Sequence, residues 1–246
     1  MTASRMLLAS LPDCIWFNWT LTSPTASELI FMSNYPLALL MCSLLLLAGC
    51  TSPGELDRWT PHGEAIESVR VQDFTLTTSE GIPWTYSEEA TNTTLAIAFL
   101  FTNCIDICPI VTHNMKWVKS QLTPEELNKT TFLTITVDPW RDNTTVLHDW
   151  KTGTNSEWMH LTSSSNDSES PSMAALQNVW INFGVGLTIE EAGTNSSARH
   201  HPDDYTVNHS TGTILVDRFG YQRVWWGDND WILDLFLEDL RHLHTL

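Results

Sequence analysis

The stretch Thr94-Leu-Ala-Ile-Ala-Phe-Leu-Phe-Thr-Asn-Cys-Ile-Asp-Ile-Cys-Pro109 joins a nearly continuous apolar run to a C-x₃-C-P turn. The apolar run, residues 94–101, is typical of a central β-strand that is buried on both faces. Apolar side chains then recur at helical spacing over residues 110–122, and the proline that closes the quoted stretch suits the first turn of a helix. Cys104 and Cys108 are therefore expected where a central strand passes into a helix.

Predicted strands and helices alternate through the rest of the chain. We expect a hairpin over 69–77 and 82–86, strands over 131–137 and 158–161, a second hairpin over 213–217 and 221–225, and helices over 124–127, 143–151, 171–183 and 228–246. The segment 184–204 is expected to be irregular, with a polar insertion at 190–201. This order predicts an α/β fold with a central mixed β-sheet flanked by helices and an N-terminal β-hairpin. A cysteine pair at the end of the first central strand is the thioredoxin-like layout.

Near the N-terminus, residues 36–50 form an apolar run shorter than the roughly 20 residues that span a bilayer. The run ends in Leu47-Ala-Gly-Cys50, which resembles a bacterial lipobox at the end of a signal peptide. In that interpretation Cys50 carries lipid and holds the domain on the outer face of the cytoplasmic membrane; an uncleaved anchor would leave it on the same side. Translation could begin at Met1 or at Met32. The expected organisation is a leader over residues 1–50, a tether over 51–66 and one domain over 67–246.

The chain is acidic, with 29 Asp and Glu against 12 Lys and Arg and a formal net charge of −17. Such a surface repels nucleic acid and anionic lipid headgroups, so we expect no nucleic-acid partner. Asn-x-Ser/Thr triplets recur, and they could be glycan acceptors in an exported domain or chance matches in a Thr- and Asn-rich sequence. They begin at Asn92, Asn128, Asn143, Asn166, Asn195 and Asn208.

Three of the five cysteines, Cys14, Cys42 and Cys50, lie within the predicted leader. That leaves Cys104 and Cys108 as the thiol pair of the folded domain. A thiol at a helix N-terminus has a lowered pKa, because the positive end of the helix dipole favours the thiolate. Two such thiols could close to a structural disulfide or hold one soft metal ion, for which thiolates select Cu(I); an added imidazole could also hold Cu(II), whereas structural zinc would need a fourth ligand. The spacing alone leaves these alternatives open.

Four blocks, in order along residues 69–240, resemble the Sco/SenC family, the thioredoxin-fold copper chaperones of cytochrome oxidase assembly. The second block resembles the family's C-P-D-V-C-P copper motif, the third its strand ending in V-D-P-x-R-D, and the fourth its V-D-H-S segment. The blocks are Asp73-Phe-Thr-Leu-Thr77 with Gly81, Phe99–Pro109, Thr134-Ile-Thr-Val-Asp-Pro-Trp-Arg-Asp142, and Tyr205-Thr-Val-Asn-His-Ser210 before Ile214–Gly220.

The resemblance implies that Cys104, Cys108 and His209 ligate one copper ion, as Cu(I) or Cu(II), with the two cysteines forming a disulfide in the oxidised chain. It implies delivery of that ion to the copper centre of a respiratory oxidase subunit. Two positions depart from the family pattern, because Ile105 stands where the family usually has proline and Asn208 where it has aspartate. The first change bears on the stiffness of the loop, and the second removes a carboxylate beside the imidazole, a position that tunes metal affinity.

The same residues also fit a thiol-disulfide oxidoreductase, in which Cys104 or Cys108 attacks a disulfide of a partner protein and His209 only tunes the thiolate. A metallochaperone needs no turnover chemistry, and this is the function that the resemblance favours over an enzyme. A peroxide-reducing relative would need a Thr/Ser-Pro loop around one activated cysteine, and the sequence shows no such signature. His200 and His201 could capture a metal ion first or belong to a solvated loop, and Asp138 is expected to orient the loop that follows its strand.

Overall fold

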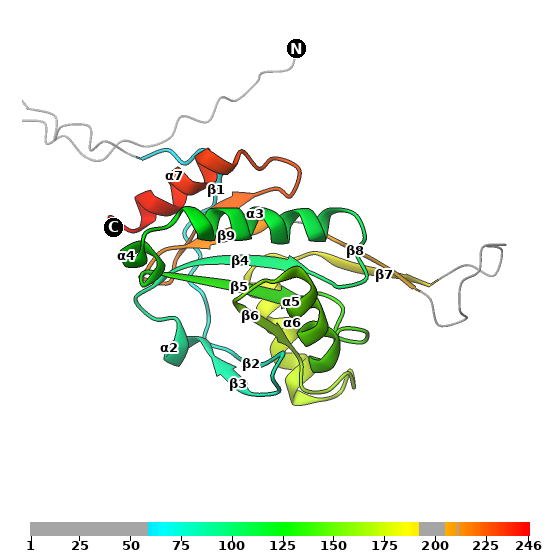
Figure 1. Cartoon of the computed structure of the whole chain (residues 1–246). Coiled ribbons are helices and arrows are strands. Elements are labelled where there is room, and N and C mark those ends of the chain that lie inside the picture. Colours follow the sequence, from blue (N-terminus) through cyan, green and yellow to red (C-terminus); the bar gives the residue numbers. More distant parts are fainter. Residues whose placement is uncertain (1–58, 192–204, 211) are drawn as a thin grey trace, which may run out of the picture. The chain divides into compact units, whose positions relative to one another are not determined.

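A computed structural model describes residues 59–191, 205–210 and 212–246. The predicted leader with its lipobox-like sequence, the predicted tether up to residue 58 and the predicted polar insertion from residue 192 onward lie outside the described residues. Within the described part an eight-stranded mixed sheet has the strand order β1-β10-β9-β4-β5-β6-β2-β3 (Figure 1). The strands of this sheet are β1 (Glu64–Ala65), β2 (Thr75–Thr78), β3 (Pro83–Thr85), β4 (Thr94–Leu100), β5 (Thr130–Thr136), β6 (Met159–Thr162), β9 (Thr213–Val216) and β10 (Gln222–Trp226). The helices are α2 (Tyr86–Glu89), α3 (Ile107–Gln121), α4 (Pro124–Leu127), α5 (Thr144–Thr154), α6 (Pro171–Asn182) and α7 (Leu233–Leu243).

The middle of the sheet is the parallel pair β4 and β5, which are in register from Thr94 opposite Thr130 to Leu100 opposite Thr136. Every residue of β4 is buried, which confirms the prediction of a central strand covered on both faces. Because side chains alternate along a strand, β4 supplies two separate cores. Leu95, Ile97 and Phe99 pack in the core that includes α6, and the residues between them pack in the core that includes α3 and α7.

The predicted thioredoxin-like order of strands and helices is confirmed, with three local corrections. The segment 184–204 was expected to be irregular, but β7 (Leu187–Glu191) pairs antiparallel with β8 (Tyr205–His209) in a separate two-stranded sheet. Sequence periodicity missed this hairpin because its strands are short, and the first of them includes two residues, 190 and 191, of the predicted polar insertion. The last helix begins at Leu233 rather than 228, since a turn in which Asp230 N donates to Gly227 O precedes it. Of residues 69–77, only Thr75 onward is strand.

The N-terminal end of the described chain is held by a buried carboxylate on α7. Asp239 accepts hydrogen bonds from His62 N at 2.9 Å, Gly63 N at 3.0 Å and Trp226 Nε1 at 3.1 Å, and its side chain is fully buried. These bonds place residues 62 and 63 beside β10, where β1 adds to the sheet edge. Among the described residues, no helix is both long and apolar enough to cross a bilayer.

We predict that Asp239→Ala lowers the free energy of unfolding by about 2–3 kcal/mol, because three donors lose their acceptor at a buried site. Urea denaturation followed by tryptophan fluorescence measures this change. The control is Glu238→Ala, which removes an exposed pair with His62 and should change the free energy by less than about 0.5 kcal/mol. Equal effects of the two substitutions would contradict the role of Asp239.

Candidate copper and thiol site

The two cysteines lie where β4 passes into α3, in a segment that we call the thiol loop, residues 101–108, which includes the first residues of the helix. Cys104 is half-buried, and Cys108, in the first turn of the helix, is only 1% exposed. Cys108 N donates to Cys104 Sγ at 3.4 Å, and Cys104 N donates to Phe101 O at 3.3 Å. Both cysteines are free thiols, so the structure describes the reduced form of the pair. Ile105 between them is 95% exposed, as expected where the chain turns outward.

The environment divides the two thiols into one that ionises easily and one that holds its proton. The hydrogen bond from the Cys108 thiol lowers the pKa of Cys104 to about 5, against the opposing effect of burial, and the backbone N–H groups of residues 106–108 add to this. The same thiol–thiolate bond, together with burial, raises the pKa of Cys108 far above its ordinary value. At neutral pH the pair therefore carries one negative charge on the more accessible sulfur and one proton on the buried sulfur.

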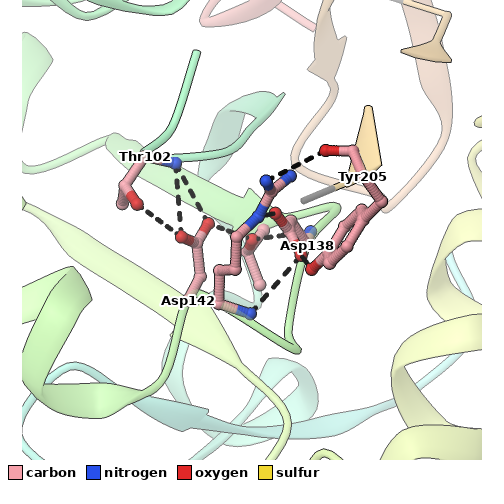
Figure 2. Close-up of polar contacts among 6 residues, drawn as sticks. Thr102, Asp138, Asp142 and Tyr205 are labelled. Carbon is pink, nitrogen blue, oxygen red and sulfur yellow. Dashed lines mark hydrogen bonds and ion pairs between the residues drawn. The ribbon is translucent and has the colours of Figure 1, made fainter. Parts of the chain in front are cut away.

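The start of the thiol loop is held by a buried carboxylate from the loop after β5. Asp142 accepts hydrogen bonds from Thr102 N at 3.1 Å, Thr102 Oγ1 at 2.5 Å and Thr136 Oγ1 at 2.6 Å (Figure 2). Burial raises the pKa of Asp142 to about 6, although its two threonine partners favour the ionised form. Thr102 is two residues before Cys104, so Asp142 determines where the loop leaves the sheet.

A second buried carboxylate, Asp138, connects the same loop to β8. Arg141 Nε and the Tyr205 hydroxyl both donate to the Asp138 carboxylate (Figure 2), and Arg141 N donates to it at 3.4 Å. The expected role of Asp138 in orienting its own loop is therefore confirmed. The sequence did not predict the contact between Tyr205 and Asp138, because 67 residues separate them and no local pattern marks the pair.

The predicted imidazole ligand, His209, is the last residue of β8. Its ring lies edge-on to Phe101, with ring centroids 5.7 Å apart, and Phe101 begins the thiol loop. Burial lowers the pKa of His209, which keeps the ring neutral at neutral pH. Its Nδ1 lies 3.0 Å from Ser210 O, so Nδ1 carries the proton that the carbonyl accepts. This tautomer leaves the lone pair of Nε2 available to a metal ion.

The donor chemistry fits a copper ion, but the three groups are not yet in one coordination sphere. A thiolate, a thiol that can give up its proton and a neutral imidazole make a set that binds Cu(I). Among the described residues, however, no three His, Cys, Asp or Glu side chains lie close enough together to hold a metal ion. The structure brings Cys104 and Cys108 together and places His209 next to their loop through Phe101.

Further residues near the sequence motifs complete this region of the chain. His113 is exposed on α3, and Asn208, the departure from the family pattern, is exposed beside His209. His200 and His201 lie outside the described residues, as does Cys50. Trp140 packs edge-on against Tyr205, with ring centroids 6.4 Å apart, and is partly buried against the core that includes α6.

We predict that alkylation of Cys104 by iodoacetamide keeps its full rate from pH 8 down to about pH 6 and falls as the pH drops through about 5, because the thiolate is then protonated. Cys108→Ala should move this midpoint upward, since the thiol that donates to Cys104 is lost. Cys108→Ser is the matched control, because it retains a donor at that position. Peptide mapping by mass spectrometry gives the rate for each cysteine, and a wild-type midpoint near 9 would contradict the geometry of the loop.

Solved structures with this architecture are similar to the chain over most of their length. Apo Sco1 from Thermus thermophilus is 23% identical, with a TM-score of 0.61, and the match covers 76% of this chain and 99% of that one. ScoI from Bradyrhizobium japonicum with copper bound is 21% identical, with a TM-score of 0.55 and coverage of 70% and 98%. BsSco, a member of the Sco family of cytochrome c oxidase assembly proteins with a disulfide switch, is 19% identical, with a TM-score of 0.53 and coverage of 75% and 98%.

These structural similarities confirm the thioredoxin-like fold, and the sequence itself carries the family assignment. No curated protein sequence matches the chain significantly. The sequence model of the SCO1/SenC family matches residues 64–225, which include β1, both cysteines, the Asp138–Asp142 segment, His209 and all but the last residue of β10. Since this match spans well over half of the sequence and runs from the first strand to the last, the chain belongs to the SCO1/SenC family.

Proposed function

We propose that this chain is a copper metallochaperone that binds one copper ion through Cys104, Cys108 and His209. The observation that carries the proposal is the division of the thiol pair into an accessible thiolate and a buried, protonated partner, beside a neutral imidazole with a free Nε2. The copper bound in the similar Bradyrhizobium japonicum ScoI supports it. Copper is cargo here, so the chain needs no turnover chemistry of its own.

The protonation states suggest the order in which the donors engage the ion. Cys104 is ionised at neutral pH and half-buried, so its sulfur meets an incoming cation first. Binding at Cys108 requires its thiol proton to leave, and the positive charge of the ion supplies the free energy for this ionisation. The His209 ring then completes the site if the last residues of β8, beyond Tyr205, move toward the thiol loop.

Release follows from the same two sulfurs. Oxidation of the two thiolates that hold the ion forms a Cys104–Cys108 disulfide. The two electrons pass to a disulfide of another protein, which takes up two protons from water and is reduced to two thiols. Both sulfur ligands are lost in that step, so copper is released. We propose that the protein that accepts the copper is the copper-binding subunit of a respiratory oxidase. We also propose that lipid on Cys50 keeps the domain at the outer face of the cytoplasmic membrane.

A thiol-disulfide oxidoreductase is the second candidate, and the low pKa of Cys104 favours it specifically. The Cys104 thiolate would attack a partner's disulfide, forming a mixed disulfide and releasing one partner thiolate. Cys108 would then lose its proton and attack Cys104 Sγ, which releases the second partner sulfur and leaves the disulfide within this chain. His209 has no required role in that reaction.

The test is copper retention by the reduced full-length chain, loaded anaerobically with Cu(I), dialysed and assayed for bound metal. We expect about one copper per wild-type chain, and an affinity at least about tenfold lower in Cys104→Ser and in His209→Ala. His113→Ala is the matched control, because His113 is an exposed histidine on α3 and should change nothing.

The thiol chemistry of the same proteins separates the two candidate functions. His209→Ala should reduce a model disulfide as fast as the wild type, because neither sulfur is altered. Full copper retention by His209→Ala would remove the imidazole from the ligand set. No copper on the wild type, together with intact disulfide exchange, would establish the oxidoreductase instead.

A further inference from the structure

We infer that the segment Asp138–Asp142 is a positioning element that places His209 and Cys104 relative to each other. One arm, Asp142, holds the thiol loop through Thr102. The other arm, which we call the β8 clamp, consists of Asp138, Arg141 and Tyr205 and holds the strand that ends in His209. The inference rests on the proposed function, because it assigns these residues a role toward the same copper ion without making any of them a ligand.

The β8 clamp makes three contacts with Tyr205. The Tyr205 hydroxyl donates to the buried Asp138 carboxylate, and Arg141 Nη1 donates to Tyr205 O at 3.1 Å. The Arg141 guanidinium also lies over the tyrosine ring, 3.9 Å from its centroid, while Arg141 Nε donates to Asp138. The carboxylate of this charged pair is fully buried, and with the cation–π contact the pair fixes both the backbone and the side chain of Tyr205.

The hairpin that carries His209 depends on such an attachment. β7 and β8 pair only with each other, and in the described part of the chain neither strand joins the eight-stranded sheet. An isolated two-stranded hairpin is at best marginally stable in water. Alternation along a strand puts Tyr205, Val207 and His209 on one face of β8, and Val207 is buried in the core between them. The clamp at Tyr205 therefore fixes the start and the direction of β8, and with them the position of the His209 ring at its end.

Both arms belong to one hydrogen-bonded turn. Asp142 N donates to Asp138 O at 2.8 Å, but the two carboxylates hold different segments of the chain. Asp142 in turn binds Thr102 two residues before Cys104, and Asp138 binds Tyr205 four residues before His209. Loosening one arm should therefore misplace one metal donor while the other donors keep their positions.

The test is a double-mutant cycle on Cu(I) affinity, measured with the reduced full-length chain in competition with a chromogenic Cu(I) chelator. Arg141→Ala should lower the affinity about tenfold, within the range that residues supporting a ligand usually contribute. The same substitution in the His209→Ala background should cost little more, because Arg141 acts through His209. Tyr205→Phe keeps the ring but loses the hydroxyl, and should give a smaller loss with the same non-additivity.

The matched control is Arg223→Ala at the other end of the sheet. Arg223 Nε donates to buried Asp217 at 2.5 Å, and its guanidinium lies 5.4 Å from the Tyr221 ring centroid, so the same chemistry is removed. The register of β4 with β9 puts residue 217 beside the start of β4, whereas Cys104 follows its end. Arg223→Ala should lower the unfolding midpoint but leave Cu(I) affinity within about twofold, since no donor group moves.

Hydrogen exchange on the copper-free chain gives a readout that does not depend on the metal. Arg141→Ala should lose protection at the β8 amides, 205–209, while the β4 and β5 amides stay protected. The inference would be overturned if Arg141→Ala lowered the Cu(I) affinity equally with and without His209. It would also be overturned if Arg223→Ala lowered the Cu(I) affinity as much as Arg141→Ala does. If His209→Ala binds copper like the wild type, the proposed ligand set fails. Hydrogen exchange at the β8 amides then tests the clamp by itself. Unchanged protection of these amides in Arg141→Ala would overturn the clamp.

Discussion

The parallel pairing of β4 with β5 is the constraint on which the functional part of the structure depends. The two strands are in register to their last residues, and Val137 N continues the pairing by donating to Leu100 O at 3.0 Å. Parallel strands end at the same edge of a sheet, so the loops that follow them must meet. The thiol loop follows β4 and the Asp138–Asp142 segment follows β5, which is why Asp142 can reach Thr102. A shift of either strand by one residue would exchange its two buried faces and separate these loops.

Buried aspartates are the recurring means by which this chain attaches segments to its core. Asp239 receives the segment before β1, Asp217 receives the N–H groups and the arginine of the β9–β10 hairpin, and Asp138 receives the arginine and tyrosine beside β8. A carboxylate out of water is stable only when donors saturate it, so each of these residues enforces a particular arrangement of its partners. At two of the sites that arrangement supports the fold, and at the third it lies next to the proposed metal donors.

The thiol pair follows the same logic with a single proton. Cys104 and Cys108 share a hydrogen bond, and the loop and helix N-terminus favour the charge on the half-buried Cys104 sulfur. The arrangement suits a soft cation, which binds first to the ionised sulfur and then to the second sulfur once that has lost its proton. It also suits reaction with a partner's disulfide, which needs one attacking and one resolving sulfur. The two proposed functions therefore differ in what they require of His209 and not in what they require of the cysteines.

The sequence by itself determined the elements whose signals are local. The continuous apolar run of β4, the helical spacing after Cys108 and the C-x₃-C-P turn predicted the central strand, the helix and the thiol pair between them. It also placed Asp138 at the end of its strand, with a role in the following turn. Only the tertiary structure decided that β7 and β8 form their own hairpin, that the Tyr205 hydroxyl donates to Asp138 and that Phe101, at the start of the thiol loop, contacts the His209 ring. The physical reason is that these contacts join residues far apart in the chain, where hydrogen bonds and packing between loops leave no periodic pattern in the sequence.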